Sequence, residues 1–397
     1  MKVLIVADGR SPITRRWIKM LQPLGYHIDL VSTYPCDPVA GVNETVIVPA
    51  AFASFSGSQA GASTSSGMKR GRALISRFRG LAADLRHWLG PWSVKRNTPE
   101  FLEFINRIQP DLVHALRIPY EGMLASATPS DIPLIISTWG NDLTYHAPST
   151  RAMADATRSA LRRTDGLFSD TARDIRLAST WSFNPSKPSL TVPGNGGIDL
   201  EEINRITTGI GLAVPSQVIN PRGFRSSSVR NDTFFKSIPL VLKDRPDTRF
   251  ICPWMAGQPE ARAWIEKLDI HANVTLLPMI SQPELWREFS RSLVSVSVSV
   301  HDGTPNSLLE AMAIGCLPIC GNIESIREWI TDGENGLLVD PADPAALAEA
   351  LKRGLSDSGL RQQAAARNHE IIQSRAEITA VRRQVDDFYE KLASPQK

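Results

Sequence analysis

The sequence has few cysteines and no long apolar run. Its four cysteines, Cys36, Cys252, Cys316 and Cys320, are too scattered for a disulfide framework, and no Cys-x2-Cys or His-x3-His pair gives zinc spacing. The apolar start reaches Asp8 too early for a secretory signal, and no later stretch approaches about 18 uninterrupted apolar residues. We therefore expect a cytoplasmic protein of a reducing compartment, without an export signal or a membrane span.

The charge of the chain is concentrated in one stretch. The 397 residues are 42% apolar and 21% charged, which is ordinary usage for a soluble globular protein of two domains. The net charge is +3, but residues 69–96 alone carry eight basic residues and one acid. Because no RNP pattern, recognition helix or zinc finger accompanies this basic stretch, we expect no nucleic-acid partner.

Short β-branched runs alternate with amphipathic stretches along the chain. One series contains KVLIVAD, HIDLVS, PDLVHAL, PLIISTW and LTVPGN, and a second contains QVIN, TRFICPW, NVTLLP, LVSVSVSV, LPIC and GLLV. Such runs are typical of buried parallel strands, and two consecutive series predict an α/β protein with two Rossmann-like, doubly wound domains. We expect the first domain over residues 1–200, a linker over 201–215 and the second domain over 216–374. The segment 375–397 predicts an amphipathic helix that packs back on the first domain.

The most specific stretch, DGTPNSLLE, runs from Asp302 to Glu310 after the strand LVSVSVSV. Gly303 permits a tight turn, Thr304 can cap a helix, and Pro305 suits the first helical turn. Backbone N–H groups at such a turn donate to phosphate or sugar oxygens, and the helix dipole favours negative charge there. Two carboxylates eight residues apart accept strongly from hydroxyl groups. The stretch therefore predicts a site for an anion and a polyol.

This stretch resembles the Glu-x7-Glu motif of the retaining nucleotide-sugar glycosyltransferases of family four, which have the GT-B fold. Asp302 stands in the place of the first Glu, and Glu310 is the second. Segments 192–199 and 335–351 are also similar to that family. The resemblance implies that Glu310 accepts hydrogen bonds from the donor ribose and that Asp302 faces the transferred sugar. It also implies that the turn holds sugar hydroxyls or the diphosphate through Gly303, Thr304, Pro305, Asn306 and Ser307.

A basic loop follows the first strand of the second domain. The family has an Arg and, five positions later, a Lys that stabilise the leaving diphosphate, and the resemblance puts Arg225 and Arg230 in these places, with Arg222 as a third member or a substitute. A solvated basic loop is the alternative. The sequence contains no Asp-x-Asp and no His/Asp/Glu cluster with metal-ligand spacing. We therefore expect no metal and no cofactor, with a UDP- or GDP-sugar as the donor substrate.

Polar residues also follow two strands of the first domain, at the edge where the carboxyl ends of parallel strands meet. After the first strand, Gly9 makes a turn, and Arg10 meets an anionic acceptor or the donor diphosphate, or else begins a helix on its solvent face. The related family often has a His after the strand that ends here at Thr138, but this chain has Trp139, whose indole only donates. The nearest titratable substitutes near the acceptor are Asp142, His114 and His146, and either histidine is alternatively a structural residue.

The basic stretch 69–96 has apolar residues at helical spacing, with Trp88 and Trp92 near its end. A basic amphipathic helix of this kind can lie on an anionic membrane surface, here the inner face, and present a lipid-linked acceptor. The alternative is a helix of the first domain with a core-facing stripe and a basic outer face.

The resemblance and the residues together predict a retaining glycosyltransferase that moves a sugar from a nucleotide-diphosphate sugar to a hydroxyl of a saccharide or lipid-linked acceptor. Two other classes stay open. A nucleotide-sugar epimerase shares the two-domain architecture. A non-catalytic nucleotide-sugar-binding subunit is suggested by three departures from the family pattern, at Asp302, Arg230 and Trp139.

Overall fold

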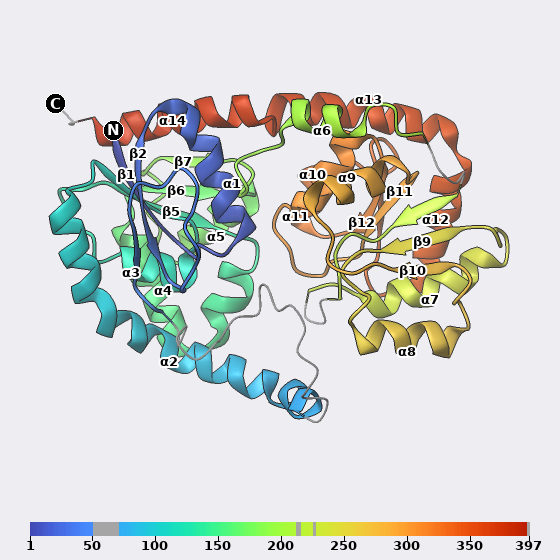
Figure 1. Ribbon diagram of the computed structural model, residues 1–397, viewed down its shortest axis with the longest axis horizontal. Helices are drawn as coiled ribbons and strands as arrows, with labels where there is room; N and C mark the ends of the chain where they lie inside the picture. Colours follow the sequence, from blue (N-terminus) through green and yellow to red (C-terminus); the bar gives the residue numbers. More distant parts are fainter. Residues whose placement is uncertain (51–70, 212–215, 225–227, 395–397) are drawn as a thin grey trace. The chain divides into compact units, whose positions relative to one another are not determined.

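The structure, a computed structural model, describes residues 1–50, 71–211, 216–224 and 228–394, and for residues 71–86 it describes the backbone alone. Within these ranges the chain divides into two compact units. Unit 1 comprises Met1–Gly196 and Arg382–Lys397, and unit 2 comprises Gly197–Val381. In each unit, helices cover both faces of one sheet (Figure 1).

Unit 1 is built on a parallel sheet with the strand order β3-β2-β1-β4-β5-β6-β7. Its strands are β1 (Lys2–Ala7), β2 (His27–Ser32), β3 (Thr45–Ile47), β4 (Leu112–Ala115), β5 (Leu134–Thr138), β6 (Gly166–Ser169) and β7 (Ser189–Thr191). Strand β1 pairs with both β2 and β4, so the direction of winding reverses between β1 and β4. In a doubly wound sheet, ligands bind at the carboxyl ends of the strands beside such a reversal.

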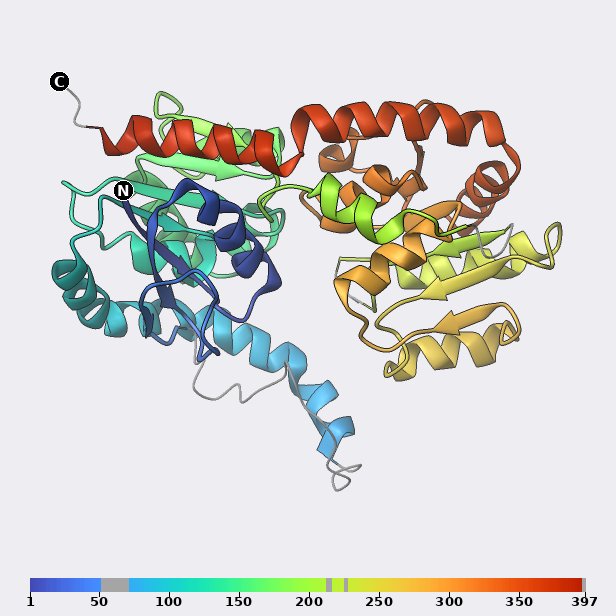
Figure 2. The ribbon, with the colours of Figure 1, turned by 45° about the horizontal axis from the view of Figure 1, so that its top comes forward.

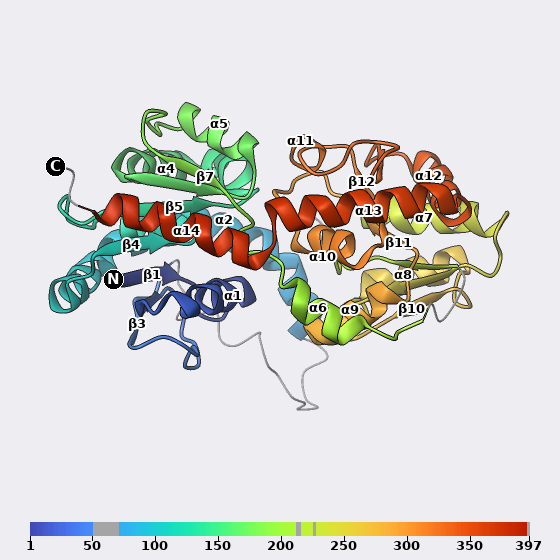
Figure 3. The same cartoon turned by 90° about the horizontal axis from the view of Figure 1, so that it is seen from above.

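The helices of unit 1 cover both faces of this sheet. They are α1 (Pro12–Leu21), α2 (Gly71–Ile108), α3 (Met123–Ala125), α4 (Arg151–Arg163), α5 (Ala172–Thr180) and most of α14 (Ile378–Ala393), with the helical turns η1 (Gln22–Leu24), η3 (Ile118–Gly122), η4 (Asp142–His146) and η5 (Ala147–Ser149). The N-terminal turns of α2 extend away from the sheet (Figure 2). Helix α14 lies over the sheet (Figure 3), where the Arg382 Nε donates to the carbonyl oxygen of Met20 over 2.7 Å.

Unit 2 repeats the arrangement with a parallel sheet of order β10-β9-β8-β11-β12-β13. Its strands are β8 (Gln217–Ile219), β9 (Arg249–Cys252), β10 (Val274–Leu276), β11 (Val294–Ser297), β12 (Leu317–Gly321) and β13 (Leu337–Val339). Its helices are α6 (Leu200–Thr207), α7 (Asn231–Leu242), α8 (Pro259–Leu268), α9 (Gln282–Ser290), α10 (Asn306–Ile314), α11 (Glu324–Arg327), α12 (Pro344–Ser356) and α13 (Ser358–Arg375). Separate apolar cores fill the two faces of this sheet.

The two sheets confirm the predicted α/β class with two Rossmann-like, doubly wound domains. The sequence pattern did not reveal β3 and β6, which are only three and four residues long. Helix α6 occupies the first part of the segment 201–215 that the sequence suggested as a linker, and its Ile203 is buried in a core of unit 2.

Candidate active site

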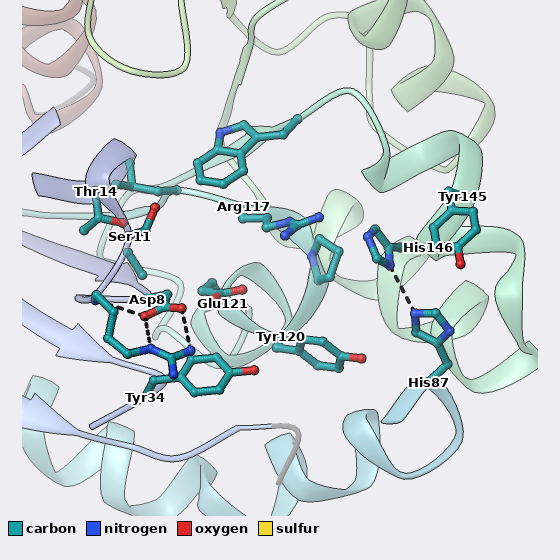
Figure 4. A pocket seen from close by; sticks show the side chains of 15 residues that line it. Asp8, Ser11, Thr14, Tyr34, His87, Arg117, Tyr120, Glu121, Tyr145 and His146 are labelled. Carbon is teal, nitrogen blue, oxygen red and sulfur yellow. Dashed lines mark hydrogen bonds and ion pairs between the residues drawn. The ribbon is translucent and has the colours of Figure 1, made fainter. Parts of the chain in front are cut away.

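Unit 1 contains a cavity of about 520 Å³ at the carboxyl ends of its central strands (Figure 4). Ala7 ends β1 and Asp8 follows it, Leu116 and Arg117 follow β4, and Trp139 follows β5. The cavity therefore lies beside the reversal of winding, the place where doubly wound sheets bind ligands. Its other lining residues come from the turn between β1 and α1, from α1, from α2 and from the turns after β2, β4 and β5: Arg10, Ser11, Thr14, Tyr34, His87, Pro119, Tyr120, Glu121, Tyr145 and His146.

Asp8 and Arg10 form a bidentate ion pair on the wall of the cavity. The Nε and Nη2 of Arg10 each donate to a carboxylate oxygen of Asp8 over 3.0 Å, and the guanidinium lies 3.8 Å from the ring centroid of Tyr34. Asp8 holds the pKa of Arg10 above its ordinary value, mainly through these hydrogen bonds. Gly9 lies at a close approach, since a Cβ there would lie 2.5 Å from the sulfur of Cys36 and would force that side chain to move. Arg10 thus lines the cavity as one half of a neutral pair.

The segment after β5 is held together by Asp142. Its carboxylate is fully buried and accepts from the Nε of Arg117 over 2.9 Å and from the backbone N–H groups of Ile118 and Trp139 over 3.2 and 3.1 Å. Burial raises the pKa of Asp142, although Arg117 acts in the opposite direction. Asp142 does not line the cavity itself. It positions two groups that do, the indole of Trp139 and the guanidinium of Arg117, which lies 5.5 Å from the ring centroid of Trp139.

The two histidines suggested by the sequence have different places. His146 lines the cavity, and its Nδ1 lies 3.1 Å from the Nε2 of His87 on α2. His114 is fully buried on β4, on the face of the sheet that α1 and α14 cover. Its ring contacts Trp17 and Tyr389 edge-on. Because side chains alternate between the faces of a strand, His114 faces the core and is not part of the cavity lining.

The cavity also contains Tyr34, His87, Tyr120 and Glu121, which sequence reasoning missed. They come from α2 and from the turns after β2 and β4, and no short motif joins them. One signal was present, because Glu121 is an acid shortly after the end of a buried parallel strand, where polar residues commonly meet ligands.

In unit 2, Arg222 and Asp302 form an ion pair between the loops after β8 and β11. The Nη2 of Arg222 lies 2.5 Å from the Oδ2 of Asp302, and both side chains are largely buried. Asp302 also accepts from the hydroxyl of Ser299 over 3.2 Å and from the backbone N–H of Gly303 over 3.1 Å. Two residues that the sequence placed at the donor site therefore lie in direct contact, at the reversal of winding between β8 and β11.

Helix α10 follows this loop and begins at Asn306, with Pro305 at its N-cap position and no side-chain cap. Thr304 does not cap the helix as the sequence suggested, because Pro305 is the N-cap residue; the Thr304 hydroxyl instead accepts from the indole N–H of Trp329 over 2.8 Å. The first amides of α10 thus keep the donor capacity and positive dipole end that suit an anion. Glu310, just over one turn into the helix, is 2% exposed.

Several buried polar atoms of unit 2 have no hydrogen-bond partner within the described part of the chain. They lie after β8, at the end of β11 or in the first turns of α7 and α10, and they are Arg222 Nε, Asn231 Nδ2 and Oδ1, Ser297 Oγ and Ser307 Oγ. Each such atom costs about 1–3 kcal/mol when it stays unsatisfied. A polar ligand at this edge of the sheet would supply the missing partners.

Arg230 immediately precedes α7 and is only partly exposed. Its Nε and Nη2 donate to the two carboxylate oxygens of Asp232 over 2.8 and 2.9 Å, and these bonds hold the pKa of Asp232 well below its usual range. Arg225, the other member of the predicted basic pair, lies outside the described residues.

Among residues 1–50, 71–211, 216–224 and 228–394, no group of three or more His, Cys, Asp or Glu side chains is placed to hold a metal ion. Within the same residues, none of the helices has the length and apolar character that crossing a membrane requires.

Comparison with known proteins follows the division into two units. Residues 8–194 match the family described as "Glycosyl transferase 4-like domain", and residues 230–370 match "Glycosyl transferases group 1". The lipopolysaccharide core biosynthesis glycosyltransferase LpsE of Rhizobium meliloti is 28% identical over 36% of this chain and 41% of its own length. A D-inositol 3-phosphate glycosyltransferase of Streptomyces scabiei is 24% identical over 51% of this chain and 48% of its own. The matches thus span less than half the length of either relative.

Solved structures share the whole fold at low identity. Sucrose-phosphate synthase of Thermosynechococcus elongatus covers 99% of both chains with a TM-score of 0.72 and 15% identity. HepE of Anabaena, solved in complex with UDP-glucose, covers 99% of this chain and 100% of its own, with a TM-score of 0.68 and 13% identity. The architecture is thus that of the GT-B class. The chain belongs to the group 1 glycosyltransferases, as its resemblance to them predicted.

Proposed function

We propose that this protein transfers a sugar from a nucleotide-diphosphate sugar to a hydroxyl of a saccharide or lipid-linked acceptor. The observation that carries the proposal is the polar edge of unit 2, where the uncapped start of α10, the buried carboxylate of Glu310 and several unpartnered polar atoms occur around the reversal of winding. This combination suits a ligand that is anionic at one end and rich in hydroxyls at the other.

The proposal assigns the donor to unit 2. Glu310 binds the ribose hydroxyls, and the α10 amides and Ser307 bind the diphosphate or the sugar. Arg222, Arg225 and Arg230 stabilise the negative charge that develops on the departing nucleoside diphosphate. HepE, with the same fold, has been solved with UDP-glucose, which supports a nucleotide sugar as the donor class.

The acceptor belongs to unit 1 in this proposal. Its cavity combines aromatic walls with charged groups that are already paired, as in Asp8–Arg10 and Arg117–Asp142. Aromatic faces pack against the apolar faces of sugar rings, and paired charges still donate and accept hydrogen bonds. The acceptor end that enters this cavity is therefore a sugar.

The experiment that tests the function is a transfer assay. UDP-, GDP- and ADP-sugars are incubated with methyl glycosides and with a lipid-linked saccharide, and products are identified by mass spectrometry. A new glycoside that depends on both substrates supports the proposal. Conversion of the nucleotide sugar without an acceptor identifies an epimerase, and nucleotide binding without any product identifies a binding subunit.

The proposal includes retention of the anomeric configuration and independence of metal ions. Both follow from the resemblance to family four, and arginines take the place of a cation beside the diphosphate. NMR of the product would show an α-linkage from an α-configured donor. Activity should survive EDTA; strict loss on chelation, restored by Mg²⁺ or Mn²⁺, would contradict this part of the proposal.

A second proposal concerns α2. Trp88 is 71% exposed and Trp92 is 57% exposed, four residues apart, and the guanidinium of Arg96 lies 5.9 Å from the ring centroid of Trp92. Exposed tryptophans beside basic residues suit the interface of an anionic membrane. Co-sedimentation with phosphatidylglycerol vesicles at low salt should be lost in the double variant Trp88→Ala/Trp92→Ala and kept in Met279→Ala, whose side chain is 80% exposed in unit 2. Absence of wild-type binding would refute the membrane contact.

A further inference from the structure

We propose that Glu121 is the residue of the unit 1 cavity that binds a hydroxyl of the acceptor sugar, and that its ionised form binds it more tightly than its neutral form. The inference rests on the proposed function, because it concerns the acceptor side of the same reaction. Three observations support it: the backbone conformation of the turn η3, the hydrogen-bond and charged neighbours of the Glu121 carboxyl group, and the position of this group in the cavity.

The turn after β4 has a strained backbone. Tyr120 has φ 67° and ψ −54°, a conformation that a bulky side chain rarely adopts and that costs about 1–3 kcal/mol. Gly122 follows at a close approach, since a Cβ there would lie 2.9 Å from the carbonyl oxygen of Arg117. Strain of this kind persists where the surrounding structure enforces it. The backbone from Tyr120 to Gly122 therefore fixes the direction in which the side chain of Glu121 points.

The carboxyl group of Glu121 is buried but faces the cavity. The residue is 6% exposed and lines the cavity, and its Oε1 accepts from the hydroxyl of Thr33 over 2.9 Å. In the view of Figure 4, Glu121 lies between Asp8 and Tyr120. Asp8 forms an ion pair with Arg10, and Asp142 forms one with Arg117, but Glu121 forms an ion pair with neither arginine. A buried carboxyl group that is not paired with a guanidinium can still accept a hydrogen bond from a hydroxyl group of a ligand.

The charge state of Glu121 is set by its neighbours. Burial raises the pKa of Glu121 to about 7, Arg117 and the Thr33 hydroxyl oppose this shift, and Asp8 adds to it. The group therefore changes from neutral to ionised across the neutral range. The other titratable or charged groups that line the same cavity are Arg10, Tyr34, His87, Tyr120, Tyr145 and His146.

A carboxylate accepts a hydroxyl hydrogen bond about twice as strongly as a neutral acceptor does. Sugar binding to unit 1 should therefore be about fivefold tighter at pH 8.5 than at pH 5.5, with a midpoint near 7. Glu121→Gln preserves the volume of the side chain and removes its titration. Thr33→Val removes a hydrogen bond that favours the ionised form, so the midpoint should move to higher pH.

Saturation-transfer NMR tests this with the full chain and three probes, the methyl α-D-glycosides of glucose, mannose and galactose. We expect at least one probe to bind with this pH dependence, Glu121→Gln to abolish the dependence, and Thr33→Val to raise its midpoint. Two controls, His87→Gln in the cavity and Glu260→Gln on the surface of unit 2, should keep the wild-type midpoint.

Any of three results would overturn the assignment of Glu121. They are no binding of any probe at either pH, an unchanged pH profile in Glu121→Gln, and a midpoint that moves with His87→Gln and not with Thr33→Val. If Glu121→Gln does not fold, the Thr33→Val midpoint alone decides. Thermal stabilisation of the same preparation by UDP or GDP separates the two levels, because nucleotide binding without glycoside binding refutes Glu121 and leaves the proposed donor site standing.

Discussion

The buried imidazole of His114 makes the stability of unit 1 depend on pH. The indole N–H of Trp17 donates to the hydroxyl of Tyr389 over 3.4 Å, which leaves the proton of that hydroxyl for His114 Nδ1 at 2.5 Å. The Nε2 then donates to the hydroxyl of Ser137 over 2.8 Å. This network suits the neutral ring only, because protonation of Nδ1 would place two donors against each other in an aromatic core.

Burial lowers the pKa of His114 from 6.5 to about 3. As the pH falls, His114 therefore binds a proton near pH 6.5 in the unfolded chain but only near pH 3 in the folded chain. The resulting stability is fully present above pH 6.5 and is lost as the pH falls from 6.5 towards 3. At about 1.4 kcal/mol per pKa unit, the full loss is about 5 kcal/mol, of which about 2 kcal/mol falls between pH 7.5 and pH 5.

Urea unfolding of wild type and His114→Gln, at pH 7.5 and pH 5 and constant ionic strength, measures this loss. Wild type should lose about 2 kcal/mol more than the variant over this interval, because glutamine does not titrate. His271→Gln, which changes an exposed histidine of unit 2, should keep the wild-type slope. Equal slopes in wild type and His114→Gln would refute the buried neutral imidazole and return His114 to the candidates for the cavity.

Two further predictions concern residues that support the cavity without lining it. Gly9→Ala should destabilise unit 1 by about 1–3 kcal/mol, because a Cβ there would lie 2.5 Å from a neighbouring sulfur, whereas Gly257→Ala, with open space around it, should change the urea midpoint little. Asp142→Asn should cost about 1–3 kcal/mol, because it weakens the buried hydrogen bonds that hold Arg117 and the segment after β5. The exposed Asp155→Asn serves as its control, and a loss as large in that variant would contradict the structural role of Asp142.

The long strands could be predicted from the sequence because a strand that is buried on both faces has a continuous run of apolar, β-branched residues. Strand β1 is such a run, and all but its first residue are buried. Strand β3 could not be predicted, since its three residues are all half-buried at the edge of the sheet. Strand β6 has the sequence GLFS, and because two of its four residues are a glycine and a serine, it lacks the apolar, β-branched pattern of a strand.

The candidate sites could be predicted only where their residues share one stretch of chain. The turn and helix from Asp302 to Glu310 form such a stretch, and α10 begins within it. The cavity of unit 1 is different, because its walls come from α1, α2 and the ends of four strands, β1, β2, β4 and β5. The contact of Gly90 with Tyr120 illustrates this, since a Cβ at Gly90 would lie 2.3 Å from that ring although 30 residues separate the two. Pairings of this kind depend on the folded topology and leave no local pattern.

The central claim is that unit 2 binds the nucleotide of a sugar donor through Glu310. Titration calorimetry of UDP, GDP and ADP against wild type, Glu310→Gln and the surface control Glu266→Gln tests it most directly. The account predicts that one nucleotide binds wild type and Glu266→Gln equally, and that Glu310→Gln weakens it about 10- to 100-fold, as expected for loss of a charged hydrogen-bond acceptor. Absence of binding to wild type, or equal binding to Glu310→Gln, would contradict it.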